Sequence, residues 1–305
     1  MVRSRHSSPP VWRRPLVFAY AVAALLLTAP CGAQTIEREM FVSVLDQAAK
    51  PVLTLGVPDF VVREDGRIRE VLRARRATDV IDIALLVDTS QALGDQVNDV
   101  RKGIEAFIAR MRPQAQISII GLADRPTIYT DYTDSEEQLA KGVGRIFPVP
   151  GSGAYILDAV GEVLKSFEKR KPERSAVVVV FAGGREFGTT PYESLIDGLK
   201  ARGTALYVVA IGGATPPDVR TTEGRDRELL FDRGTTETGG HRDIILSSMA
   251  TADALERLAA EMLGQYRITF ARPDTLIPPE KTEVAVRPAG LKARGTLVPA
   301  RTATK

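Results

Sequence analysis

The chain has 305 residues, with 41 Lys and Arg against 38 Asp and Glu, and it contains a single cysteine, Cys31. One cysteine excludes a fold held together by intramolecular disulfides, and a chain of this length buries enough apolar surface for one large core or two smaller ones. The positive charge comes from the first 33 residues, because the remainder has 37 basic and 38 acidic residues. The composition therefore gives no argument for a nucleic-acid or an anionic-membrane partner.

The N-terminal segment has the layout of a secretory signal. Four arginines precede the apolar run Leu16–Leu27, and small residues follow it up to Ala33. This pattern predicts a signal peptide over residues 1–33, with cleavage after Ala33. The run is shorter than the roughly 20 apolar residues of a membrane span, although an uncleaved anchor or a lipid on Cys31 remains an alternative. We expect an exported protein that is periplasmic, secreted or associated with the cell envelope, with no membrane insertion after cleavage.

Both ends of the remaining chain have β patterns. Residues 34–77 alternate between apolar and polar positions and predict short strands at 41–45, 60–63 and 68–72, with Asp65-Gly66 as a hairpin turn. Residues 265–305 contain two further β segments, at 266–271 and 281–288. Neither end has enough strands to be stable alone, so we expect them to pair into a small β-sandwich.

The middle of the chain, residues 78–264, alternates strands with helices. The strands read as continuous apolar runs, and apolar residues at helical spacing lie between them. The predicted strands are 81–88, 117–122, 175–184, 204–213 and a short strand at 241–246, with an edge strand at 127–132. Strands this apolar are buried on both faces, which predicts an α/β fold with a doubly wound, mostly parallel sheet.

Local signals refine this middle region. Thr190 and Glu193 form a capping-box pattern at a helix start, and Gly203 stands where that helix is expected to end. The charged stretch 220–233 is predicted to be a mostly irregular insertion near the carboxyl edge of the sheet and a candidate for partner contact. Leu229, Leu230 and Phe231 are possible anchors of a short helix within it. His241 is the one histidine outside the signal segment. Because it lies beside a Gly-Gly turn, we expect it to be an exposed loop residue.

The stretch "LLVDTSQAL", residues 85–93, identifies a family. Together with the order of elements it resembles the von Willebrand factor type A domain over about residues 78–264. The flanks "VLDQAAKPVLTLGVPDFVVREDG" and "QYRITFARP" resemble bacterial exported proteins related to this family, in which β segments bracket the type A domain. The resemblance implies a non-enzymatic protein-interaction module, with adhesion or scaffold character.

In that family a metal-ion-dependent adhesion site gathers Asp-x-Ser-x-Ser, a Thr and a second Asp at the carboxyl ends of the strands. Asp88 and Ser90 match this pattern. Alanines stand at the other three positions, Ala92, Ala154 and Ala182. Mg²⁺ requires about six oxygens in near-octahedral geometry, so we expect a degenerate site without a cofactor, at which Mg²⁺ or Ca²⁺ binds weakly if at all.

Neighbouring residues offer alternatives. Ser152, Asp95 and Glu186 lie in the same predicted loops and could rebuild a metal site, which keeps a metal-dependent adhesion module open. Without a cation, Asp88 is expected to accept hydrogen bonds from backbone N–H groups of the next loop. The candidate residues for contact with an unidentified protein partner are Asp88, Thr89, Ser90, Ser152, Tyr155 and Glu186.

An enzyme is the third alternative. Ser90 or Ser152 could serve as a hydrolase nucleophile, but such a serine needs a base, and His241 is the one histidine that would remain. The same scarcity of histidine and cysteine argues against a zinc site, and neither a P-loop nor a dinucleotide-binding fingerprint is present. We therefore expect no catalytic residues.

Overall fold

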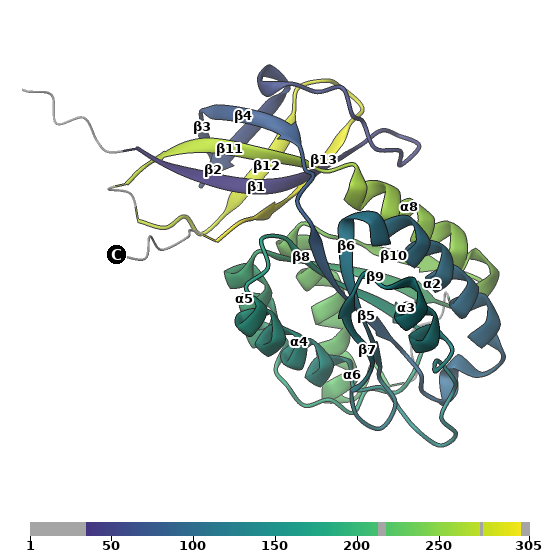
Figure 1. Cartoon of the computed structure of the whole chain (residues 1–305). Coiled ribbons are helices and arrows are strands. Elements are labelled where there is room, and N and C mark those ends of the chain that lie inside the picture. The colour runs from purple at the N-terminus through teal and green to yellow at the C-terminus, as the bar shows by residue number, and fades with distance from the viewer. Residues whose placement is uncertain (1–34, 213–217, 275–276, 300–305) are drawn as a thin grey trace, which may run out of the picture.

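The computed structural model describes residues 35–212, 218–274 and 277–299, which form a β-sandwich joined to an α/β domain (Figure 1). The signal-peptide prediction for residues 1–33 lies outside these ranges. Among the described residues, no helix is both long enough and apolar enough to cross a membrane.

The α/β domain contains a six-stranded sheet with the order β10-β9-β8-β5-β6-β7. Its strands are β5 (Ile81–Val87), β6 (Ala115–Gly121), β7 (Thr127–Thr133), β8 (Ser175–Phe181), β9 (Thr204–Ile211) and β10 (Arg242–Ile245). Neighbouring strands are parallel, except that the edge strand β7 runs antiparallel to β6. The mostly parallel sheet and the edge strand predicted from the sequence are confirmed.

Helices cover both faces of this sheet (Figure 1). One face carries α2 (Val97–Met111), α3 (Glu136–Val143) and α8 (Thr251–Leu263), and the other carries α4 (Ile156–Arg170), α5 (Tyr192–Arg202), α6 (Thr222–Leu229), the π-helical turn η4 (Leu230–Gly234) and α7 (Thr235–Thr238). Short 3-10 turns are η1 (Val57–Asp59), η2 (Gln91–Gln96), η3 (Arg112–Gln114) and η5 (Ser248–Ala250). In β5, Leu85 packs against the face that carries α2, α3 and α8, and Leu86 packs against the face that carries α4 and α5. This alternation is expected, because successive side chains of a strand point to opposite faces of the sheet. The doubly wound fold is therefore confirmed.

The two helix-end predictions for α5 have different outcomes. Gly203 ends the helix in the left-handed conformation, with a φ of 62°, as predicted. The capping box is wrong: Pro191 is the N-cap residue and provides no side-chain cap. The hydroxyl of Thr190 instead donates to Asp158 Oδ1 over 2.7 Å. Because Asp158 belongs to α4, this bond connects the segment before α5 to α4 instead of capping α5.

The chain ends combine into two small antiparallel sheets. The four-stranded sheet has the order β13-β1-β11-β4, and the three-stranded sheet has the order β12-β2-β3. Their strands are β1 (Thr35–Leu45), β2 (Phe60–Glu64), β3 (Arg67–Arg69), β4 (Val71–Arg76), β11 (Tyr266–Pro273), β12 (Thr282–Val286) and β13 (Lys292–Leu297). A shared core that includes Met40, Phe60 and Phe270 lies between the sheets. The predicted sandwich of N- and C-terminal strands is confirmed.

The sandwich differs from the prediction in two details. The strand expected at 68–72 is divided at Glu70, so that β3 pairs with β2 in one sheet and β4 with β11 in the other. Strand β13 was not predicted, because "KARGTL" has no apolar alternation. The Asp65-Gly66 hairpin turn is confirmed, and both residues have positive φ, at 48° and 77°.

The amino ends of the central sheet face the sandwich through a polar contact. Gln265 donates to the hydroxyls of Ser43 in β1 and Tyr207 in β9. Arg174, just before β8, donates to Gln265 Oε1 over 2.6 Å, and burial lowers the pKa of Arg174 to about 10. Because the sandwich covers this end of the sheet, the opposite end, where the strands finish, is left for the candidate site.

His241 lies at this sandwich contact and is not the exposed loop residue expected from the sequence. Its ring packs edge-on against Tyr207, with centroids 5.6 Å apart, and its Nδ1 lies 3.5 Å from Glu261 Oε2 and 3.3 Å from Arg294 Nη2. Burial lowers the pKa of His241, opposed by the charge of Glu261. The histidine is therefore part of the packing between the sandwich and the α/β domain.

Candidate functional site

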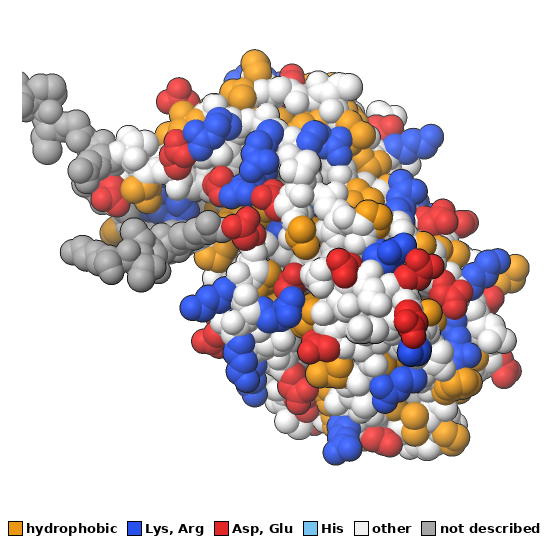
Figure 2. All heavy atoms as spheres, viewed as in Figure 1, with side chains coloured by type: hydrophobic (Ala, Val, Ile, Leu, Met, Phe, Trp, Pro, Cys, Tyr) orange, Lys and Arg blue, Asp and Glu red, His pale blue; other side chains and the backbone are white. Residues whose placement is uncertain are grey.

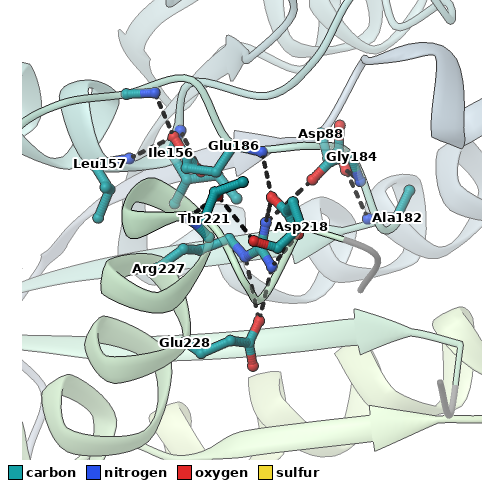
Figure 3. Close-up of polar contacts among 12 residues, drawn as sticks. Asp88, Ile156, Leu157, Ala182, Gly184, Glu186, Asp218, Thr221, Arg227 and Glu228 are labelled. Atoms are coloured by element: carbon teal, nitrogen blue, oxygen red, sulfur yellow. Dashed lines mark hydrogen bonds and ion pairs between the residues drawn. The ribbon is translucent and has the colours of Figure 1, made fainter. Parts of the chain in front are cut away.

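Asp88 follows β5 at the carboxyl end of the sheet and is fully buried. Its Oδ1 accepts from the N–H of Ser90 over 3.0 Å, and its Oδ2 accepts from the N–H groups of Ala182 (3.0 Å) and Gly184 (2.9 Å), which follow β8 (Figure 3). Three backbone donors thus satisfy the carboxylate. Asp88 connects the end of β5 to the loop after β8.

Thr89 and Ser90 are also fully buried. Thr89 Oγ1 accepts from the N–H groups of Leu122 and Ala123 after β6, over 3.2 and 3.1 Å. Ser90 Oγ accepts from the N–H of Ala92 over 3.3 Å, which caps the η2 turn. These side chains bind the protein's own loops, so a partner cannot touch them while the loops keep this arrangement.

The three alanines take part in the same loop network through their backbones. Ala92 and Ala182 donate to Ser90 and Asp88, as described above, and Ala154 forms isolated β-bridges with Ala123 and Glu186. The methyl groups of Ala154 and Ala182 are buried. The positions assigned from the sequence therefore lie around one site, and none of the three offers a side-chain oxygen.

The residues present do not fit the metal ion that the family pattern implies. Both oxygens of Asp88 already accept hydrogen bonds, and the backbone of Gly184 passes so near that an added Cβ would lie 2.3 Å from Ser90 Oγ and 2.9 Å from Asp88 Oδ1. Ser152 Oγ donates to the carbonyl of Val149, and Asp95 is exposed on η2. Within the described ranges, no three His, Cys, Asp or Glu side chains are arranged to hold a metal.

Gly184 gives a direct test of how closely the site is packed. Gly184→Ala is expected to destabilise the protein by about 1–3 kcal/mol, because the new methyl group overlaps Ser90 Oγ and crowds the Asp88 carboxylate. Urea unfolding measures the change. Gly161→Ala in α4 is the control, since its added Cβ makes only ordinary contacts at 3.7 Å and beyond. If Gly184→Ala were as stable as the wild type, the loop would have room that the structure does not show.

Glu186 is buried in the same loop and caps a helix. Its Oε1 accepts from the N–H of Gly188 over 2.8 Å, and Oε2 accepts from the N–H of Ile156 over 3.3 Å, at the first turn of α4 (Figure 3). Burial raises the pKa of Glu186 to about 8, although these hydrogen bonds and the charge of Arg227 oppose the rise. Glu186 is therefore part of the loop's framework and not an accessible contact residue.

The raised pKa of Glu186 predicts a pH dependence of stability. Between pH 4.5 and pH 8 the unfolded chain ionises this carboxyl while the folded protein keeps its proton, so folding becomes less favourable as pH rises. From pH 5 to pH 9, we expect the unfolding free energy of the wild type to fall relative to that of Glu186→Gln. Urea unfolding across this range measures it, with Glu193→Gln on the surface of α5 as control. A difference that shifts toward the wild type would contradict the assignment.

A buried ion pair completes the site. Arg227 in α6 donates through Nη1 to Asp218 Oδ2 (2.8 Å) and through Nη2 to Asp218 Oδ1 (3.0 Å), and both side chains are almost fully buried (Figure 3). Arg227 Nη1 also donates to the carbonyl of Gly184, and Asp218 Oδ2 accepts from the N–H of Glu186 over 2.7 Å. Despite its burial, the hydrogen bonds from Arg227 hold the pKa of Asp218 below its ordinary value.

The ion pair corrects the interpretation of residues 220–233. The short helix allowed for by Leu230 and Phe231 is present, but the stretch as a whole is not irregular, because it forms α6 and η4. Through Arg227 it supports the loop after β8. Sequence reasoning missed Arg227 because its charge suggested exposure. Its spacing to Leu230 and Phe231, both fully buried, was a usable signal, since residues three and four apart share a helix face.

Above this buried framework lies a small exposed surface. Phe187 is 42% exposed, its ring centroid lies 6.0 Å from that of Tyr155, and the guanidinium of Arg185 lies 5.2 Å from it. The ring packs over Gly153, where an added Cβ would lie 2.2 Å from it. Tyr155 and Ser152 are half-buried at the margin of this surface. Of the residues predicted to contact a partner, these two are reachable, whereas Phe187 has no local signal in the sequence that would have predicted its role.

A doubly wound sheet with an Asp-Thr-Ser turn at its carboxyl edge is typical of a class of α/β binding domains. The family model of the von Willebrand factor type A domain matches residues 82–236, and the chain belongs to that family. Domains of this family are in general non-enzymatic modules for protein–protein interaction. None of the curated proteins with which the sequence was compared matches it.

Solved structures with the same fold are distant in sequence. The von Willebrand factor type A protein from Catenulispora acidiphila is 11% identical, with a TM-score of 0.51 over 90% of this chain and 76% of that chain. Proximal thread matrix protein 1 from the mussel byssus, with a zinc-occupied adhesion-site motif, is 14% identical, with a TM-score of 0.50 over 66% of this chain and 49% of that chain. The chain spans about half the length of the mussel structures it matches. Identities this low show the fold alone.

Proposed function

We propose that this protein is an exported, non-enzymatic interaction module that binds a protein partner without a metal ion at the former adhesion site. The observation that carries the proposal is the Asp88 carboxylate, which three backbone N–H groups already satisfy. A partner carboxylate could bind here only by coordinating a cation with an open ligand position. Ala92, Ala154 and Ala182 supply no ligands to hold such a cation. Recognition then falls to the exposed side chains of the same loops.

The contact surface is the aromatic group of Phe187 and Tyr155 with Arg185 and Ser152 beside it. Exposed aromatic and arginine side chains are enriched where protein interfaces gain most of their binding energy. The buried framework of Asp88, Glu186 and the Asp218–Arg227 pair holds the loop that carries Phe187 and Arg185. A rigid loop loses little entropy when it binds, which favours a preformed interface.

Affinity capture tests this function. The chain from Gln34 onward, which contains all described residues, is immobilised and exposed to exported proteins of its source in EDTA or in Mg²⁺, and retained proteins are quantified. We expect a specific partner that is retained equally in both buffers and is lost with Phe187→Ser or Arg185→Ala. Val80→Ser is the matched control, because Val80 is 55% exposed but precedes β5 at the opposite end of the sheet. Retention that requires Mg²⁺ would contradict the proposal.

The two alternatives receive less support. A rebuilt metal-dependent site would need Ser152, Asp95 and Glu186 to turn toward Asp88, whereas Ser152 binds Val149, Asp95 is exposed and Glu186 caps α4. A serine hydrolase would need a base beside Ser90 or Ser152. His241, the histidine of the described chain, packs against Tyr207 at the sandwich contact, at the other end of the sheet.

A further inference from the structure

A groove runs between α4 and the edge of the central sheet. On this face of the sheet α4 packs on β5 and β8, whereas the described helix beside β7 is α3, which lies on the opposite face. The α4 side of β6 and β7 therefore keeps a hollow that no described helix fills. Its space, including the part open to solvent, is about 370 Å³, which is at the small end for a ligand pocket.

Apolar side chains line both walls of the groove. Ile120 in β6 and Ile128 in β7 are neighbours across the strand pair, and Ala159 and Val163 of α4 line the other wall. Ile128 is 59% exposed. An aliphatic chain that entered the groove would remove these groups from water, which is favourable.

The hydroxyl groups that line the groove can accept hydrogen bonds. Ser118 Oγ donates to the carbonyl of Thr130 over 2.9 Å and keeps its lone pairs for a donor. The hydroxyl of Tyr132 is buried beside Ser166 without a well-formed hydrogen bond among the described residues. Burial raises the pKa of Tyr132, and Ser166 opposes the rise. The inside of the groove thus offers oxygen atoms to a donor.

Two carboxylates give the groove its charge. Asp131 of β7 and Glu162 of α4 line it, are exposed to solvent and form no ion pair within the described part of the chain. Residues 78–264 as a whole contain 21 Lys and Arg against 28 Asp and Glu. Acidic and basic side chains are intermixed on the face of this domain seen in Figure 2, so the residues that line the groove decide its local charge.

The cations nearby do not neutralise these carboxylates. Arg170 lies 4.3 Å from the centroid of the Tyr132 ring, but it is paired with Asp82 over 2.8 Å. Arg125 and Lys165 are close in sequence to groove residues, yet neither is among the side chains that line it. The groove therefore combines aliphatic walls with acceptor oxygens and uncompensated negative charge.

A lysine side chain has the matching chemistry. Its four-carbon stem can lie on an apolar wall while its ammonium group stays at the polar rim. A guanidinium binds best as a planar fork on one carboxylate or stacked on an aromatic ring, and Arg170 already lies over the ring of Tyr132. A compact ammonium with three rotatable donors suits separate acceptor oxygens better.

We propose that this groove accepts a lysine side chain of the protein partner, with its stem against Ile120, Ile128 and Val163 and its ammonium between Asp131 and Glu162. The inference rests on the proposed function, because it gives the same partner a second contact.

The groove begins close to the aromatic contact surface. Ala159, which lines it, donates its N–H to the carbonyl of Tyr155 over 3.1 Å, so the two residues are one helical turn apart. One partner can therefore cover Tyr155 and Phe187 and place a lysine in the groove.

An NMR titration tests the groove without the partner, so its failure is distinguishable from failure of the proposed function. Amide chemical shifts of the chain from Gln34 onward are followed as n-butylammonium chloride, which has the stem and charge of a lysine side chain, is added. n-Butanol is the uncharged match. We expect saturable shifts centred on Ile128, Asp131 and Val163, and about fivefold tighter binding of n-butylammonium than of n-butanol, the effect of two exposed charge pairs. The difference should shrink as the salt concentration rises.

Variants of the two carboxylates decide the assignment. Asp131→Asn with Glu162→Gln should remove the preference for n-butylammonium, whereas Glu105→Gln, an exposed acid of α2 on the other face of the sheet, should keep it. Absence of shifts in the groove, equal binding of n-butanol, or tighter binding of n-butylguanidinium would overturn the proposal.

Affinity capture then tests whether the partner uses the groove. The Asp131→Asn, Glu162→Gln double variant should retain less partner than Glu105→Gln. Undiminished retention that still depends on Phe187 would overturn the groove assignment and leave the proposed function standing. If the wild type retained no partner, the proposed function would fail, and with it the assignment of the groove to a partner's lysine.

Discussion

Arg227→Met is expected to lower the unfolding free energy by about 3–5 kcal/mol, the cost of leaving a buried charge without its partner. Asp218 would remain buried beside the N–H of Glu186 with no guanidinium to balance it, and the carbonyl of Gly184 would lose a donor. Urea unfolding followed by circular dichroism gives the difference. The loop after β8, which carries Arg185 and Phe187, should also become more mobile.

Two further variants make this result interpretable. Arg225→Met, on the exposed face of the same helix, should change stability by less than about 0.5 kcal/mol. The double variant Asp218→Asn with Arg227→Met should regain part of the loss, because no unpaired charge is then buried. If Arg227→Met matched Arg225→Met in stability, the ion pair would not support the loop as described.

Asp88→Ala is expected to cost about 3 kcal/mol or more, since it leaves three buried N–H groups without an acceptor. The donors belong to two loops, so the variant should also separate the end of β5 from the loop after β8. Thermal unfolding and amide hydrogen exchange at Ala182 and Gly184 report the two effects. Exchange at these amides should become much faster.

Asp95→Ala is the control, because Asp95 is exposed on η2. Asp88→Asn should fall between the two, as its amide keeps one acceptor oxygen and turns two donors toward backbone N–H groups. If Asp88→Ala were as stable as Asp95→Ala, the Asp88 carboxylate would have no structural role. It would then be free to act as a metal ligand.

Most of the fold was predictable because strong periodicity accompanies strong burial. In β8, every residue from Ser175 to Phe181 is buried, and the uninterrupted apolar run predicted this. The elements that were missed have weak local signals. Strand β13 contains Lys292, Arg294 and Gly295, and it is held by pairing with β1, more than 240 residues away in sequence. Such long-range pairing leaves no period in the local sequence.

At the candidate site, only the missing metal ligands could be predicted from the sequence. The resemblance of the segments around Asp88, Ala154 and Ala182 to the family motif allowed the missing oxygens to be placed from sequence, and the structure brings these positions together. What holds the site instead was not predictable, because the donors to Asp88 are backbone N–H groups, which every sequence has. The Asp218–Arg227 pair is close in sequence, but its contact with Gly184 spans 43 residues.

Thermal unfolding of the chain from Gln34 onward, in EDTA and then with millimolar Mg²⁺, Mn²⁺ or Zn²⁺, tests the central claim most directly. A metal at about 100 times its Kd would add about 2.7 kcal/mol, which for a protein of this size raises Tm by roughly 5–10 °C. We predict a change of less than about 1 °C for each ion, on the same scale. A rise of several degrees that disappears with Asp88→Asn would contradict the account and establish a metal site at Asp88.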